Sequence, residues 1–160
     1  MVRSNIVIAS CCLGFLSSSV FAASLLERLE LATEEIGKNQ GQFYVSRVPE
    51  LADKMPSWDW DDEIRTASKC MLDGISSEKG AEVAEAYVAG LELEAAKEIT
   101  SFTSLSSDEN IPAELKGNDS TIADLQQRCG TIDISINRLK ESGLWDALIE
   151  PSVMQRLIAE

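Results

Sequence analysis

The strongest constraint on the fold is a run of apolar residues that recur at helical spacing through residues 84–102. Small residues stand between them, which lets a neighbouring helix approach closely. Positions three or four apart share one face of an α-helix, so the run predicts a long helix with a buried side. Its apolar members are Ala84, Val88, Leu91, Ala95, Ile99 and Phe102.

An earlier helix is predicted by a capping box at the start of the chain's polar part. The hydroxyl of Ser24 can accept a hydrogen bond from the third helical amide, while Glu27 reaches back to the cap. Glycines at positions 37 and 41 predict that this helix ends near Ile36. Residues 42–56 are then expected to be irregular, and residues 43–45 lean towards β-structure.

Two more helices and two short terminal ones complete the expected fold. One begins within residues 57–62 and runs to about Ile75, with Gly74 and Gly80 bracketing a turn. A fourth follows a cap in residues 119–121 and continues to Leu139, although residues 131–137 also alternate as a strand would. After Gly143, residues 144–149 and 153–158 form short helices. The prediction is one small all-α domain of four main helices.

The first 22 residues resemble a cleaved secretory signal peptide. Arg3 provides the positive region, residues 6–21 the mostly apolar one, and Ala22 the small residue before cleavage. Lipidation at Cys11 is a minor alternative, because residues 8–11 resemble a bacterial lipobox. We therefore expect residues 23–160 to form one exported domain, in a bacterial periplasm or outside the cell, without insertion into a membrane.

Export decides how the remaining cysteines are interpreted. Cys11 and Cys12 leave with the signal, so Cys70 and Cys129 remain in an oxidising compartment. Cys70 lies beside the apolar stripe of its helix and Cys129 lies within the stripe of another. We predict a disulfide between these two helices, located in the core.

The chain is strongly acidic, with a net charge of −13. Loss of Arg3 with the signal leaves 13 basic residues against 27 acidic ones, a net charge of −14. This charge argues against binding to nucleic acid or to an anionic membrane. It favours a cationic protein or peptide as partner, although acidity also serves solubility alone.

The absence of histidine from the whole sequence removes many mechanisms. Triads with a histidine base and histidine-containing zinc sites are excluded. A hydrolase that uses two carboxylates survives, and Glu92, Glu94 and Glu98 on the long helix are its candidates. A solvated helix face explains the same residues without catalysis, and no cofactor is expected.

The densest functional candidate is the segment of residues 58–62. Its acids lack the alternating spacing around a glycine that calcium loops require, so capping of a helix start explains them better than a metal does. Exposed tryptophans would anchor a protein partner well, and Trp145 is a second choice. We therefore predict a non-catalytic interaction module, with an envelope hydrolase as the alternative. The predicted partner-binding residues are Trp58, Asp59, Trp60, Asp61 and Asp62.

Overall fold

The computed structural model describes residues 23–106, 109–116 and 121–159, which are mostly helical and contain no strand. The predicted signal peptide and the cap at residues 119 and 120 lie outside these residues. The helices pack into one small domain, which confirms the all-α prediction. In chain order they are α1 (Leu25–Arg47), η1 (Pro49–Lys54), α2 (Asp62–Lys79), α3 (Ala81–Ala95), η2 (Phe102–Ser106), η3 (Ala113–Leu115), α4 (Thr121–Cys129), α5 (Thr131–Glu141), α6 (Leu144–Leu148) and α7 (Pro151–Ile158).

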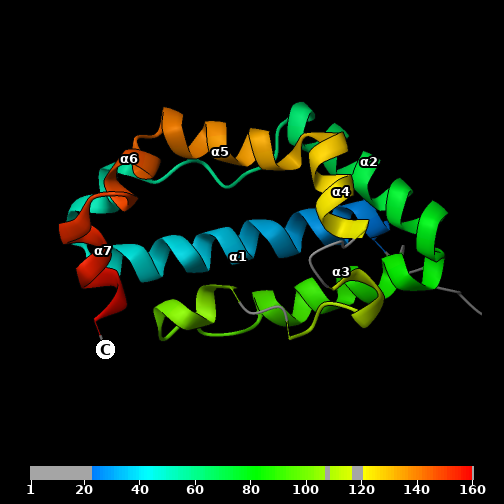
Figure 1. The fold of residues 1–160 in the computed structure, drawn as a ribbon, viewed down its shortest axis with the longest axis horizontal. Helices are drawn as coiled ribbons and strands as arrows, with labels where there is room; N and C mark the ends of the chain where they lie inside the picture. Colours follow the sequence, from blue (N-terminus) through cyan, green and yellow to red (C-terminus); the bar gives the residue numbers. More distant parts are fainter. Residues whose placement is uncertain (1–22, 107–108, 117–120, 160) are drawn as a thin grey trace, which may run out of the picture.

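Helix α1 is the central element, and it lies along the long axis of the molecule with α3 on one side and α5 on the other (Figure 1). The predicted capping box starts it: the amide of Glu27 donates to the Ser24 hydroxyl at 3.2 Å, and the amide of Ser24 donates to the Glu27 carboxylate at 2.7 Å. Arg28 fixes α3 beside it through Glu92, at 2.7 Å.

The predicted end of this helix at Ile36 is wrong, because α1 continues to Arg47 and includes the residues expected to be β-leaning. Gly37 and Gly41 are buried in the middle of the helix, against the indole of Trp58. A Cβ added at Gly37 would lie 2.5 Å from Cε3 of Trp58. These glycines allow close packing and do not end the helix.

Several other boundaries also differ from the predicted ones. Helix α2 continues past Gly74 to Lys79, since Gly74 makes room for Leu125 of α4. Helix α3 ends at Ala95, well before Phe102. The expected fourth helix is two helices, because Gly130 adopts φ +75° between α4 and α5. Residues 131–137 are helical, and Gly143, at φ +78°, ends the turn before α6 as predicted.

Two separate hydrophobic clusters form the core, one towards each end of α1. The first joins α1 to α2, α3 and α4 around Leu29, Met71 and Ile75. The second joins the other end of α1 to η1, α6 and α7 around Phe43 and Leu144. Helix α5 bridges the distance between the two clusters, above the middle of α1 (Figure 1).

Cys70 and Cys129 form the predicted disulfide, with an S–S distance of 1.97 Å and a Cα–Cα distance of 5.8 Å. Its predicted location in the core is wrong. Cys70 is exposed and Cys129 is half-buried at the edge of the first cluster. The apolar side of α2 is occupied instead by Ala67, Met71 and Ile75, which turns Cys70 outward. The bond therefore joins α2 to α4 at the surface, one residue before the start of the Gly130 turn.

Candidate functional site

An elongated cavity of about 460 Å³ lies between α1, α5 and the segment of residues 56–60. Its volume is in the range of cavities that hold small molecules. Along α1 it extends from Leu29 to Tyr44, about 22 Å at the rise of an α-helix. The lining is mostly apolar and comes from four sides: Leu29, Ile36 and Tyr44 of α1, Pro56 and Trp60 of the segment, Met71 of α2, and Ile136 and Leu139 of α5.

Helix α5 roofs this cavity without packing fully onto α1. Ile136 and Leu139 face the cavity and are only half-buried, and Ile132 remains 42% exposed. No residue of α5 is fully buried, although the helix is amphipathic. Its apolar side therefore faces open space where an ordinary bundle would place another helix.

Two mostly buried residues also line the cavity with side chains that carry a hydroxyl group. Ser68 of α2 is 5% exposed and Tyr87 of α3 is 6% exposed, and both line it. Neither hydroxyl has a hydrogen-bond partner among the described residues. Burial raises the pKa of Tyr87 to about 12, so the phenol stays protonated and can donate. Unpartnered hydroxyls in a cavity are available to a ligand or to water.

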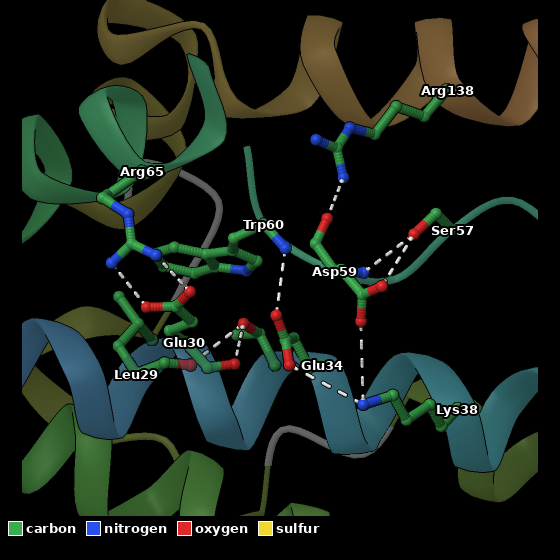
Figure 2. A network of polar contacts seen from close by, with 10 residues as sticks. Leu29, Glu30, Glu34, Lys38, Ser57, Asp59, Trp60, Arg65 and Arg138 are labelled. Carbon is green, nitrogen blue, oxygen red and sulfur yellow. Dashed lines mark hydrogen bonds and ion pairs between the residues drawn. The ribbon is translucent and has the colours of Figure 1, made fainter. Parts of the chain in front are cut away.

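Helix α5 is connected at both ends through glycines in the left-handed conformation, Gly130 and Gly143. The Cys70–Cys129 disulfide fixes the chain just before the first glycine. In the last turn of α5, Arg138 pairs with Asp61 of the segment opposite at 2.6 Å. It also donates to the Asp59 carbonyl at 3.0 Å (Figure 2). A single side chain thus closes the side of the cavity.

The segment below Arg138 is held to α1 by polar contacts. The amide of Trp60 donates to the Glu34 carboxylate at 3.0 Å (Figure 2). Lys38 lies 3.6 Å from the same carboxylate and 4.0 Å from that of Asp59. The Ser57 hydroxyl donates to the Asp59 carboxylate at 3.3 Å. These contacts fix the wall of the cavity independently of α5.

The predicted partner-binding residues lie together in this wall. Trp58 covers the glycines of α1 and is half-buried, while Trp60 packs against the first hydrophobic cluster and lines the cavity. Asp61 caps α2 by accepting from the amide of Ile64 at 2.9 Å. The exposed Asp62 begins the helix. These residues therefore have structural roles within the fold. That they bind a cationic protein stays a prediction.

The acid at the cap has a lowered pKa. The hydrogen bond from the amide of Ile64 is the main cause, and Arg138 adds to it, so both lower the pKa of Asp61 below its usual range. The carboxylate is therefore ionised at neutral pH, which maintains the pair with Arg138.

Trp145, the second predicted anchor, is half-buried with the ammonium of Lys140 over its ring at 5.9 Å.

The carboxylates considered for hydrolysis are divided between two locations. Glu92 is paired with Arg28, which lowers the pKa of that carboxyl and opposes a role as general acid. Glu94 and Glu98 line a different hollow, of about 530 Å³, between α1, α3, residues 99–105 and Glu109. Glu94 is bound there by Lys97 at 3.0 Å and by the amide of Asn110 at 2.7 Å.

Sequence reasoning missed the cavity, although two signals for it were present. Gly130 and Gly143 bracket the eleven residues of α5, and Ser68 interrupts the apolar side of α2.

Within the described ranges, no group of three or more potential metal ligands is arranged to hold an ion. None of the described helices is long and apolar enough to cross a membrane. No family model, curated protein or solved structure matches this chain.

Proposed function

We propose that the protein is an exported, non-catalytic binding module that holds a linear aliphatic ligand in the cavity between α1 and α5. The single observation that carries the proposal is the cavity itself, which separates two hydrophobic clusters and is about 22 Å long. Its mostly apolar lining can make van der Waals contacts along the length of a linear aliphatic chain. Export rests on the signal-like first 22 residues.

The chemistry of the lining supports binding over catalysis. Among the described residues, Arg138 is the only lysine, arginine or acidic side chain that lines the cavity, and it is already paired with Asp61. The other polar groups are hydroxyls and amides without an adjacent base, which leaves no activated nucleophile. The hydroxyls of Ser68 and Tyr87 can hydrogen-bond to a water or to a hydroxyl group of a ligand in the cavity.

A matched pair of variants on α5 tests the location of the site. Ser135 and Asn137 are both exposed on α5, and of the two Ser135 alone lines the cavity. We expect Ser135→Phe to fill the cavity and weaken the binding of dodecanol at least about tenfold, a loss of about 1.4 kcal/mol. Asn137→Phe should leave it unchanged.

Isothermal titration of dodecanol into the purified protein, with its disulfide formed, measures both affinities. Circular dichroism and the thermal midpoint of each variant check that the fold is retained. Saturable binding by the unmodified protein, lost in Ser135→Phe alone, supports the proposal. Absence of binding, or equal binding by the two variants, overturns it.

A hydrolase remains the second candidate function, because Glu94 and Glu98 share one hollow. Within that hollow, Glu94 pairs with Lys97 and accepts a hydrogen bond from the side-chain amide of Asn110. Glu94→Gln and Glu98→Gln, assayed for turnover of cell-envelope glycan beside Glu92→Gln, test it. A loss of turnover in the first two alone, with the fold intact, would establish the enzyme and displace the binding module.

A further inference from the structure

On the side where Arg138 stands, the cavity adjoins a second, outer hollow of about 550 Å³. The two spaces share four residues, which form the boundary between them: Pro56, Ser57, Trp60 and Arg138. The outer hollow is bounded further by Met55, the 59–61 segment and the last residues of α5. A ligand with its chain in the cavity would therefore place its headgroup at this boundary or in the outer hollow.

The charges around the outer hollow are predominantly negative. Asp59, Asp61 and Glu141 line it, against a single guanidinium, that of Arg138. Arg138 is 21% exposed and its charge is matched by Asp61, while Asp59 remains 77% exposed. Lys38 approaches Asp59 from α1, and Lys54 ends near Gly143 beside the hollow, but neither lines it.

Charge complementarity thus selects the sign of the headgroup. An anionic headgroup would meet the carboxylates of Asp59 and Glu141 and would have to compete with Asp61 for Arg138. A cationic headgroup would meet those same carboxylates as counter-ions. The face of Trp60, which borders both spaces, adds an attractive surface for an ammonium group. The net charge of −13 acts in the same direction at longer range.

We infer that the natural ligand is a cationic amphiphile, with its aliphatic chain in the cavity and its ammonium group among Asp59, Asp61 and Glu141. This inference rests on the proposed function and adds the chemical class of the ligand. The acidic rim does not carry it alone: the mostly apolar cavity, which shares Pro56, Ser57, Trp60 and Arg138 with the outer hollow, is the independent observation that marks a ligand site.

Three probes of equal chain length test the inference: dodecyltrimethylammonium, dodecanol and dodecanoate, each below its micellar concentration. Isothermal titration at low and at high salt gives the affinities, and a rise of the thermal midpoint separates specific binding from denaturation. We expect the ammonium compound to bind at 1:1 stoichiometry and at least about tenfold more tightly than dodecanoate. The preference should shrink as salt rises.

Two double variants with the same change in net charge distinguish the rim from the molecule as a whole. Asp59→Asn/Glu141→Gln removes two carboxylates of the outer hollow, and Glu35→Gln/Glu82→Gln removes two exposed ones outside both spaces. The first should lower the preference for the cation at least about threefold. The second should leave it nearly unchanged.

The outcomes separate the two proposals. If dodecanol binds in the cavity but dodecanoate binds as tightly as the cation, the charge inference is wrong and the binding function stands. An equal loss of preference in both double variants also overturns it, because the preference then follows total charge. If none of the three probes binds, the proposed function falls and the inference falls with it.

Discussion

Gly37 and Gly41 leave the space on α1 that the indole of Trp58 occupies. A Cβ at Gly37 would lie 2.5 Å from Cε3 and 2.7 Å from Cδ2 of that ring, closer than real Cβ atoms approach. The ring would have to shift to admit the methyl group, and it also packs against Gly41, where a Cβ would lie 3.2 Å from its Nε1. Position 37 therefore requires glycine for its size, in a helix where alanine has the better intrinsic propensity.

We expect Gly37→Ala to destabilise the protein by about 1–3 kcal/mol through overpacking, less the gain of about 1 kcal/mol in helix propensity. Urea unfolding measures the loss. The same substitution made in a Trp58→Ala background should cost nothing or stabilise, because the methyl group then has room. An equal loss in both backgrounds would show that the indole is not the cause.

At the scale of the elements, local signals predicted the helices but not where they stop. The capping box of Ser24 and the apolar spacing of residues 84–95 are complete within their own segments, so both were readable. A glycine is ambiguous locally: Gly37 and Gly74 lie inside helices because of side chains far along the chain, whereas Gly130 and Gly143 adopt positive φ. Only tertiary packing separates these two uses.

Helix α5 is held to the rest of the molecule by few buried contacts. Its ends turn through glycines, none of its residues is fully buried, and Arg138 ties its last turn to the segment opposite. Elements with few buried contacts open at low free energy. We infer that α5 can lift from the cavity when the contacts of Arg138 are removed.

Arg138→Ala should therefore increase amide hydrogen exchange within residues 131–141 and leave α1 protected. Arg128→Ala, which removes a surface pair with Glu78 between α4 and α2, is the matched control. Acid should act like the mutation. Because the pKa of Asp61 is lowered in the fold, the pair contributes stability above the ordinary aspartate pKa and loses it as pH falls through the lowered value. Unchanged exchange in Arg138→Ala would refute a tethering role.

On the scale of the whole molecule, the candidate site is the cavity between the two hydrophobic clusters. Sequence reasoning singled out the aromatic and acidic residues of the 58–62 segment. In the structure Trp58 and Trp60 line the cavity, whereas Asp59 and Asp61 line the outer hollow. Sequence reasoning did not find the cavity, because its lining joins residues 29–44, 56–71 and 126–148 with Tyr87. No local pattern reports which apolar stripe remains uncovered, since that depends on where α5 lies relative to α1.

The Cys70–Cys129 disulfide holds α2 and α4 together beside the first hydrophobic cluster. It joins residues separated by 59 positions and lies immediately before the Gly130 turn that starts α5. Closing a loop of this length restricts the unfolded chain by about 4 kcal/mol on the loop-entropy model. Because Cys70 is exposed, the bond fills little core volume, and its effect should come from loop closure and not from packing.

Replacement of both cysteines by serine should lower the free energy of unfolding by up to about 4 kcal/mol. Replacement of both by alanine should give the same loss, since little packing is exchanged at the surface. Urea unfolding of the two double variants, beside the oxidised and the reduced unmodified protein, makes the comparison. If alanine and serine differed by more than about 1 kcal/mol, the sulfurs would be acting through burial. If neither variant lost stability, the constraint on α2 and α4 would have to come from their side-chain contacts alone, with Leu125 against Gly74 as the principal one.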